Sequence, residues 1–361
     1  MTYRAAVIGS GRIGLALELD PKRPKPATHA GAWMQHPKTE LVALCDSDPA
    51  FKTVAGKLAP DAICYSDAQA MLSAERPEIV SIATHQDSHV ELARLAVACG
   101  AKAVLCEKPI SDNLAAARAL IDEANNAGVH LIVNHARRFD PLLRRLADEL
   151  SNGLIGDLLQ VTGYYVYGLV STGTHLIDLL RMTLGPREGD VTWVAAWPNA
   201  HGVHYPEGDP CIDGVLGFES GLKVFIQSLD MRSYDHFEVR YFGRDGAVVC
   251  NGLTRRVDLF AAGEAATRAR FSELPREPNS SWSNLDCSYF ELATENVVDC
   301  IEGRTQSLST GRDSVAALAI LKAMLESSEA EGRRIVLSLE DAAGLPQLPA
   351  QVIASARNRI R

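Results

Sequence analysis

The sequence predicts an α/β N-terminal domain with a doubly wound parallel sheet over residues 1–135. An α+β domain with a large, mostly antiparallel open sheet is expected over residues 136–361. Three observations predict this division. A chain of 361 residues is too long for one ordinary hydrophobic core. In the first part, buried-strand patterns alternate with helical patterns. After about residue 150, short β runs follow one another, several of them separated by Gly, Asp and Asn turns.

Apolar runs of strand length recur through the first domain, each followed by a helical pattern. The expected strands cover residues 4–9, 40–46, 62–66, 78–84, 103–109 and 130–135. Helical patterns begin at LALEL, resume in THAGAWMQHP, and then cover residues 48–59, 67–75, 87–100 and 111–127. Three prolines between Asp20 and Pro26 break the first of these helices, which predicts a surface loop there.

The second domain is expected to contain one early helix and two late ones. The early helix covers residues 173–185 and ends at Gly185-Pro186, whereas the late helices lie near residues 284–303 and 312–331. We expect the late helices to pack on one face of the sheet or back on the first domain. The other face, if apolar, would then form a homodimer or homotetramer interface. Residues 262–283 are polar and are expected to be irregular.

The composition excludes several classes of protein. Hydrophobic residues make up 47% of the chain, charged residues 22%, and the net charge is −9, which argues against a nucleic-acid partner. The first strand begins almost at the N-terminus, and no apolar run is long enough to span a membrane, so neither a signal peptide nor a membrane partner is expected. The eight cysteines are scattered without a C-x-x-C pair, which favours a reducing, cytoplasmic location and predicts no metal site.

A glycine-rich turn follows the first strand directly. This G-x-G-x-x-G motif is weak evidence alone, but a buried strand before it and a helix after it are what dinucleotide binding requires. The first glycine permits a tight turn, the second lets the backbone approach a pyrophosphate, and the third allows close packing on the strand. A purely structural strand–helix turn remains the alternative. The expected cofactor contacts are Gly9, Ser10, Gly11, Arg12, Ile13 and Gly14.

An acidic residue at the end of the second strand should bind the hydroxyls of the adenosine ribose. Asp46 occupies this position, although it follows the glycines by more than the usual interval, which the proline loop and its flanks explain. Its carboxylate would repel a 2′-phosphate, so NAD is favoured over NADP. Asp48 is expected to cap the next helix. Arg12 could contact a phosphate or simply face solvent.

Oxidation of a secondary alcohol needs a hydride acceptor and a base for the hydroxyl proton. Lys108 lies at the carboxyl end of the expected strand AVLCEKP, beside Glu107 and before Pro109. Catalytic groups of this fold are expected at that end of the strands. Burial and a cationic nicotinamide could lower the pKa of a lysine enough for it to act as a base. Its position alone is equally typical of a solvated lysine.

Four motifs in order resemble the Gfo/Idh/MocA family, which includes glucose–fructose oxidoreductases, inositol dehydrogenases and rhizopine-catabolism proteins. The resemblance covers nearly the whole chain. The motifs are GSGRIG, Glu107-Lys108-Pro109, the run NHARRFDP from Asn134 to Pro141, and the run GTHLID from Gly173 to Asp178.

The resemblance implies an NAD-dependent oxidoreductase that acts on a ring hydroxyl of a sugar, sugar derivative or cyclitol. It implies that Lys108 is the catalytic lysine and that its bond to Pro109 is cis. It further implies that His175 faces the reacting hydroxyl and that Asp178, one helical turn later, orients the substrate or the histidine. The implied cofactor contacts are completed by Thr84, His85, Glu107, Lys108 and Asn134. The implied substrate contacts are Lys108, Arg137, Ser171, Thr174, His175 and Asp178.

Two positions depart from the family pattern. Many members have an aspartate four residues before the histidine, where this chain has Ser171, and serine is a poor base. We interpret that change as substrate divergence. His85 stands where the family often has proline, so only a backbone contact near Thr84 is expected there.

Three other functions remain open. An NAD-assisted glycoside-cleaving enzyme of the same family would oxidise a sugar carbon transiently, release the aglycone and return the hydride. A non-catalytic sensor would bind the dinucleotide and regulate a partner; intact Lys108 and His175 argue against it. A tightly held cofactor recycled between two sugars usually accompanies an export signal, which is not expected here.

Overall fold

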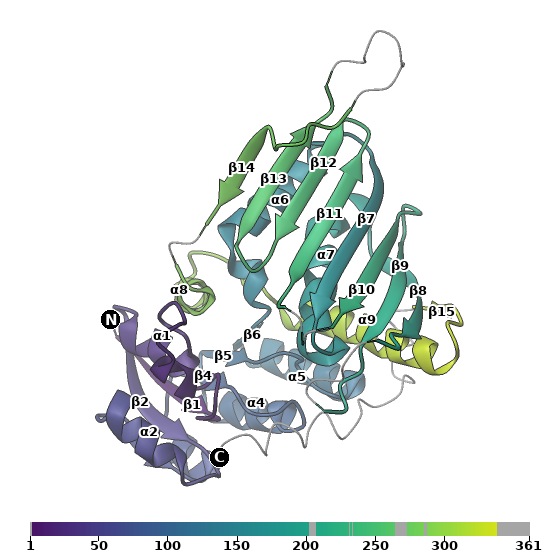
Figure 1. Cartoon of the computed structure of the whole chain (residues 1–361). Coiled ribbons are helices and arrows are strands. Elements are labelled where there is room, and N and C mark those ends of the chain that lie inside the picture. The colour runs from purple at the N-terminus through teal and green to yellow at the C-terminus, as the bar shows by residue number, and fades with distance from the viewer. Residues whose placement is uncertain are drawn as a thin grey trace, which may run out of the picture. The chain divides into compact units, whose positions relative to one another are not determined.

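The computed structural model describes residues 2–201, 207–230, 232, 234–263, 273–284 and 287–337. The chain forms two compact units (Figure 1). Unit 1 contains residues 1–140 and 286–315, and unit 2 contains residues 141–285 and 316–361. Unit 1 therefore extends a few residues beyond the expected boundary at 135 and takes in a later segment of the chain.

Unit 1 is built on a six-stranded sheet in the order β3-β2-β1-β4-β5-β6. Each neighbouring pair of strands is parallel. The strands are β1 (Tyr3–Ile8), β2 (Thr39–Cys45), β3 (Ile63–Tyr65), β4 (Ile79–Ile82), β5 (Ala103–Cys106) and β6 (His130–Val133). From β1 the chain adds β2 and β3 on one side and then β4, β5 and β6 on the other side. This is the doubly wound arrangement expected from the sequence.

The central strands are buried along their whole length because helices cover both sides of a parallel sheet. All residues of β4 and β5 are buried. The helices that belong to unit 1 are α1 (His29–Gln35), α2 (Phe51–Leu58), α3 (Ala68–Glu75), α4 (His89–Ala98), α5 (Leu114–Asn126) and α8 (Tyr289–Ile301). Two short 3₁₀ turns, η1 (Ala16–Leu19) and η2 (Ala136–Phe139), complete it.

The helix that begins after the glycine turn is interrupted by the proline loop, as expected, but its first part is a 3₁₀ turn and not an α-helix. Only one turn and η1 follow the glycines, and the chain then leaves the helix axis through the proline-rich loop. It returns at α1, where the backbone N–H groups of His29 and Ala30 donate to the carbonyls of Ile13 and Gly14. The carbonyls left open by the first turn are thus satisfied by the resumed helix.

This excursion explains the long interval before Asp46. His29 bonds to Ile13 across 16 residues, whereas a regular helix spans four, so the excursion inserts 12 residues. Without them, Asp46 would follow Gly14 by 20 residues, which matches the interval usual for this fold.

Of the two late helices, α8 packs in unit 1 and not on the antiparallel sheet. Its buried residues Ala293, Val297, Val298 and Cys300 belong to the same core as Tyr3, Trp33 and Leu44. A capping box at Ser288 and Glu291 fixes the start of α8. Of the two placements expected for the late helices, packing back on the first domain therefore holds for α8.

Unit 2 contains a nine-stranded sheet in the order β14-β13-β12-β11-β7-β10-β9-β8-β15. All neighbouring pairs are antiparallel except β10 with β7. The expected fold class, a Rossmann domain followed by a mostly antiparallel sheet, is confirmed. The strands are β7 (Leu158–Val166), β8 (Val191–Pro198), β9 (Ile212–Phe218), β10 (Lys223–Leu229), β11 (Phe237–Gly243), β12 (Gly246–Asn251), β13 (Arg256–Ala261), β14 (Ser280–Ser283) and β15 (Ile335–Val336).

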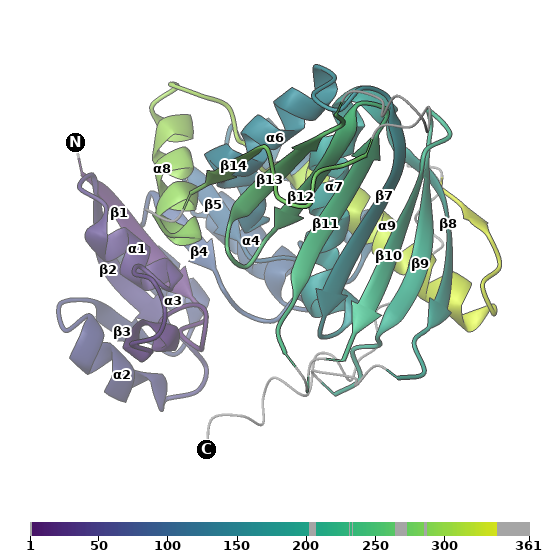
Figure 2. The same ribbon diagram turned by 45° about the horizontal axis from the view of Figure 1, so that its top comes forward.

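Helices lie behind this sheet in both ribbon views, and the opposite face is open (Figures 1 and 2). They are α6 (Pro141–Ser151), α7 (Thr174–Glu188) and α9 (Gly311–Glu329), with a π-helical turn η3 (Leu169–Gly173) before α7. Burial alternates along β10, with Val224 and Ile226 buried and Lys223, Phe225 and Gln227 exposed. This period of two shows that only one face of the sheet is covered.

Two local predictions in unit 2 need correction. Helix α7 does not end at Gly185-Pro186 but continues to Glu188, with Gly189 N–H donating to the Gly185 carbonyl. Pro186 is tolerated in the last turn of the helix. The segment expected to be irregular ends in strand β14, which pairs with β13. Residues 264–272 of that segment lie outside the described residues.

Candidate functional site

Five predicted site residues lie within two residues of the ends of strands in the parallel sheet. Gly9 follows β1, Asp46 follows β2, Glu107 follows β5 and Asn134 follows β6, while Thr84 comes two residues after β4. Parallel strands place their carboxyl ends at one edge of a sheet, and the order of these strands reverses between β1 and β4. Ligands of open α/β sheets bind in the crevice at this edge.

The glycine turn is shaped by close backbone contacts. Gly9 has a φ of +90°, and a Cβ there would lie 2.6 Å from the carbonyl carbon of Ala83. A Cβ on Gly14 would lie 1.8 Å from the carbonyl oxygen of Gly9. Gly11 differs, because a Cβ built on it would meet no atom within 4 Å. Gly9 and Gly14 are therefore required by the packing of unit 1, whereas the space beside Gly11 is open for a ligand.

Asp46 connects the glycine turn to the end of β2. Its Oδ2 accepts from the backbone N–H of Ser10 at 2.8 Å, and its Oδ1 accepts from Asp48 N–H at 2.9 Å. Asp48 in turn accepts from Ala50 N–H, at the start of α2. A carboxylate can accept about four hydrogen bonds, so Asp46 retains capacity for ribose hydroxyls.

Lys108 begins a turn whose conformation is set on both sides. Its peptide bond to Pro109 is cis, as expected. His89 connects this turn to the loop after β4, with Nδ1 2.9 Å from the Pro109 carbonyl oxygen and Nε2 3.1 Å from that of Thr84. Burial lowers the pKa of His89, against the effect of these two carbonyls and of Glu107.

Glu107 lies at the centre of a buried polar network that the sequence did not reveal. Its Oε1 accepts from His29 Nε2 at 3.0 Å and from Asn134 Nδ2 at 2.7 Å. His29 also contacts Ser81 Oγ at 3.2 Å. The only available sign was a serine inside the otherwise apolar run EIVSIAT.

Four predicted residues of unit 2 lie around the start of α7. Ser171 is in η3, and Thr174, His175 and Asp178 are in α7. Ser171 and His175 are half-buried, whereas Thr174 and Asp178 are buried. The three-residue spacing places His175 and Asp178 on one side of the helix.

An aspartate not anticipated from the sequence holds η3 in place. Asp209 is fully buried and accepts from the N–H groups of Val170 at 2.8 Å and Ser171 at 2.7 Å. A Cβ on Gly168 would collide with its carboxylate. Asp209 therefore fixes the backbone at the position where many family members have an aspartate of their own.

The remaining predicted residues are placed in loops and turns of unit 1. Arg12 is exposed and Ile13 half-buried in the glycine turn, and His85 is half-buried in the loop after β4. Arg137 is half-buried in η2. Its neighbour Arg138 pairs with Asp313 at 3.1 Å.

A family model decides the relationship of the chain to known proteins. The model for an oxidoreductase family with an NAD-binding Rossmann fold, Gfo/Idh/MocA, matches residues 3–135. An inositol 2-dehydrogenase of Rhizobium meliloti (strain 1021) is 26% identical over 354 residues, which cover 94% of this chain and 100% of the relative. Residues 3–135 are therefore similar to the NAD-binding domain of the Gfo/Idh/MocA family.

Other relatives agree with this similarity. A D-apiose dehydrogenase of Paraburkholderia graminis is 28% identical over 336 residues, covering 86% of this chain and 87% of the relative. The solved structure of the WlbA dehydrogenase from Bordetella pertussis, in complex with NADH and UDP-GlcNAcA, has a TM-score of 0.72 at 22% identity. It covers 94% of this chain and 99% of that chain. At this identity the similarity shows the fold.

The sheet edge of unit 1 fits a dinucleotide. Besides the open space at Gly11, two buried polar atoms that follow β4 and β6 make no hydrogen bond with the described residues. They are Asn134 Oδ1, directly after β6, and Gln86 Nε2, in the loop after β4. Buried polar atoms are normally hydrogen-bonded, so these two atoms are suited to groups that a ligand would bring.

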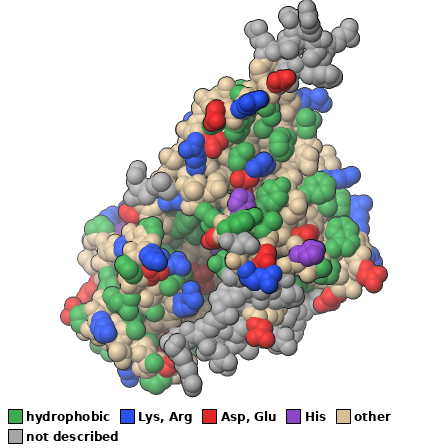
Figure 3. Space-filling view, viewed as in Figure 1, with side chains coloured by type: hydrophobic (Ala, Val, Ile, Leu, Met, Phe, Trp, Pro, Cys, Tyr) green, Lys and Arg blue, Asp and Glu red, His purple; other side chains and the backbone are tan. Residues whose placement is uncertain are grey.

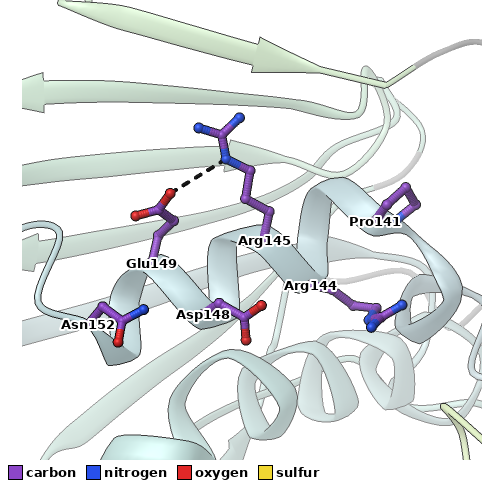
Figure 4. A pocket seen from close by; sticks show the side chains of 6 residues that line it. All are labelled: Pro141, Arg144, Arg145, Asp148, Glu149 and Asn152. Carbon is purple, nitrogen blue, oxygen red and sulfur yellow. Dashed lines mark ion pairs between the residues drawn. The ribbon is translucent and has the colours of Figure 1, made fainter.

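Other features of the described residues do not compete with this site. A surface groove of about 390 Å³ runs along α6, lined by Pro141, Arg144, Arg145, Asp148, Glu149 and Asn152, and contains none of the predicted residues (Figure 4). Within the described ranges, no group of three or more His, Cys, Asp or Glu side chains is arranged to hold a metal ion. No helix in the same ranges has the length and apolar character needed to cross a bilayer.

Proposed function

We propose that this protein is an NAD-dependent dehydrogenase that oxidises a ring hydroxyl of a sugar, sugar derivative or cyclitol. The observation that supports this best is the common sheet edge, at which the open glycine turn, Asp46 and Lys108 all follow parallel strands. The substrate class is supported by relatives named for inositol and D-apiose.

The cofactor is proposed to be NAD. The pyrophosphate would lie against the backbone of the glycine turn, with Gly11 permitting its approach. Asp46 would bind the ribose hydroxyls, and its negative charge would disfavour the 2′-phosphate of NADP. Asn134 and the loop from Thr84 to Gln86 would bind the polar groups of the nicotinamide half. The NADH bound in the structure of the WlbA dehydrogenase supports the same class of cofactor.

Proton transfer is assigned to Lys108. When bound, the nicotinamide supplies the hydride acceptor. The Lys108 amine, in its unprotonated form, takes the hydroxyl proton as the carbon–hydrogen bond breaks. His175 and Asp178 bind and orient substrate hydroxyls, with Thr174 and Arg137 as further contacts.

Ser171 is assigned to substrate binding and not to proton transfer. Its hydroxyl can donate to and accept from a substrate hydroxyl, but its pKa is far too high for a general base. The carboxylate of Asp209 accepts the backbone N–H of Ser171, so the backbone from which the Ser171 hydroxyl extends is held in place. The change from aspartate therefore alters which substrate is recognised while leaving Lys108 to accept the proton.

A test of this proposal is NADH formation by the purified protein with NAD⁺ and a panel of hexoses, sugar phosphates, nucleotide sugars and inositols. Absorbance at the NADH band and product analysis are recorded together. Stoichiometric NADH and a ketone product are expected for at least one panel member. Release of an aglycone from glycosides with no net NADH would instead indicate the glycoside-cleaving reaction. Tight NAD⁺ binding without any turnover would favour the sensor.

The open face of the nine-stranded sheet is proposed to join subunits into homodimers or homotetramers. Across three neighbouring strands it presents Ala195, Val215 and Phe225 in register, with Trp197 nearby on β8. Phe225 and Trp197 are both partly exposed. Hydrophobic side chains lie between charged ones on this face (Figure 3). Light scattering that gave only a monomer mass at micromolar concentration would reject this assembly.

A further inference from the structure

A chain of hydrogen bonds crosses the interior of unit 1 and ends on Glu107. Trp33 Nε1 donates to Ser81 Oγ at 2.7 Å, and Ser81 Oγ lies 3.2 Å from His29 Nδ1. His29 Nε2 lies 3.0 Å from Glu107 Oε1. The side chain of His29 has no exposed surface, and that of Glu107 is 12% exposed.

The donors and acceptors of this chain define a direction. An indole N–H can only donate, so Ser81 accepts from Trp33 and its own hydroxyl hydrogen can be donated to His29 Nδ1. The Nε2 nitrogen of His29 then carries the proton that is donated to Glu107. The tautomer of a histidine is set by the partner of its other nitrogen.

Beyond Glu107 the chain reaches Lys108. The second carboxylate oxygen, Oε2, accepts from the backbone N–H of Lys108 at 3.3 Å. Asn134 donates to Oε1 from the end of the neighbouring strand. Glu107 is thus held from two sides, and its carboxylate contacts the backbone of the residue assigned to proton transfer.

We propose that His29 is a positioning residue for the dehydrogenase reaction, acting through Glu107 on Lys108 and on the charge at the end of β5. This inference rests on the proposed function for its effect on turnover. His29 holds Glu107 ionised and in a single orientation. Glu107 in turn fixes the start of the cis turn from which the Lys108 side chain extends.

The position of His29 is itself set by the proline-loop excursion. The backbone N–H of His29 donates to the carbonyl of Ile13, where the interrupted helix resumes. Thr28 caps α1, and Glu18 Oε2 accepts from both Thr28 Oγ1 at 2.8 Å and Ala27 N–H at 2.9 Å. The ring of Phe290 contacts His29 edge-on at 5.1 Å between ring centres.

Charged and titratable groups that face Glu107 come from several elements. They are His29 of α1, His89 of α4, Lys108 and, from β5, Cys106. Burial raises the pKa of Glu107, but the hydrogen bond and charge of His29, with Lys108 and Asn134, lower it to about 2 from 4.5. A carboxyl with a depressed pKa adds stability that is complete above pH 4.5 and is lost as the pH falls toward 2.

Three variants separate positioning from packing. His29→Phe keeps an aromatic ring against Phe290 but removes the donor to Glu107, whereas His29→Gln keeps an N–H donor. Glu107→Gln removes the acceptor charge. His36→Gln is the matched control, because His36 also pairs with a glutamate, Glu295, in the same unit. The double variant His29→Phe/Glu107→Gln closes a mutant cycle.

Two sets of measurements are made on each variant. The first is the free energy of unfolding as a function of pH, with NAD⁺ affinity, neither of which needs a substrate. We expect the stability difference between wild type and His29→Phe to shrink below pH 4.5, because the wild-type carboxyl then loses its advantage. The second is the pH profile of kcat/KM, in which His29→Phe should gain an acid limb and lose between about tenfold and 100-fold at neutral pH.

The cycle decides the assignment. His29→Gln should recover most of the wild-type rate and pH profile, His36→Gln should match wild type, and His29→Phe should add no further loss to Glu107→Gln. Equal pH dependence of stability in wild type and His29→Phe, or a full additional loss in the double variant, would overturn the role of His29. If wild type binds NAD⁺ but turns over no substrate, the proposed function fails, while the substrate-free measurements still test His29. Should His29→Phe not fold, comparison of wild type with His29→Gln and Glu107→Gln provides the same test.

Discussion

At the scale of single residues, Asp46 is the side chain that we propose selects the cofactor. Both of its oxygens accept backbone N–H groups, from Ser10 and Asp48, so the carboxylate is oriented before any ligand arrives. A group held in this way loses little freedom on binding, and its charge is directed at one edge of the site. NAD should therefore bind with little rearrangement of this loop.

Replacement of Asp46 by alanine should weaken NAD⁺ binding and reduce the ratio of the affinity for NAD⁺ to the affinity for NADP⁺. The loss of hydrogen bonds to a charged acceptor corresponds to about 1.5–3 kcal/mol. Titration calorimetry with both cofactors measures the two affinities. Asp48→Ala is the control, since it removes only the bond to Ala50 N–H. An unchanged ratio of the two affinities in Asp46→Ala would show that another group selects the cofactor.

Residues that end parallel strands were predictable, but their buried partners were not. Gly9, Asp46, Glu107 and Asn134 follow apolar runs, and the rule that such ends share an edge brings them together. His29 lies 78 residues from Glu107 in the chain, and no local pattern pairs them. A buried polar contact of this kind depends on how a helix rotates against a sheet, which sequence spacing does not specify.

At the scale of elements, the glycines of the turn before the interrupted helix serve two purposes, which are close packing and access for a ligand. Gly9 and Gly14 are needed because neighbouring backbone atoms fill the space a Cβ would take, while Gly11 faces open space. The proline residues predicted the loop correctly. They could not indicate that the helix would resume on the same axis, since that depends on backbone bonds across 16 residues.

Two alanine substitutions in this turn should each impair a different property, either the stability of the protein or its affinity for NAD⁺. Gly14→Ala should destabilise the protein by about 1–3 kcal/mol, because a Cβ 1.8 Å from the Gly9 oxygen forces the turn and the helix apart. Gly11→Ala should leave the stability near that of wild type but weaken NAD⁺ binding, since its methyl group enters the ligand's space. Urea unfolding and NAD⁺ titration distinguish the two. Equal loss of stability in both variants would contradict this division of roles.

At the scale of the whole molecule, the chain crosses between its two units more than once. The parallel and antiparallel sheets follow from the alternation of patterns, so both were predicted with their order along the sequence. The return of α8 to unit 1 was left open, because an amphipathic helix fits either sheet equally well by pattern alone. Likewise, Asp209 reaches η3 from a loop beyond β8.

Proton transfer by Lys108 is the step on which the proposed NAD-dependent oxidation depends. It is tested by the rate of NADH formation by Lys108→Met, measured beside NAD⁺ affinity, with a variant of a partly exposed lysine, Lys102→Met, as control. We expect kcat/KM of Lys108→Met to fall by about 10²–10⁴-fold while NAD⁺ still binds and the control stays active. A Lys108→Met protein that forms NADH at the wild-type rate would show that another group accepts the proton.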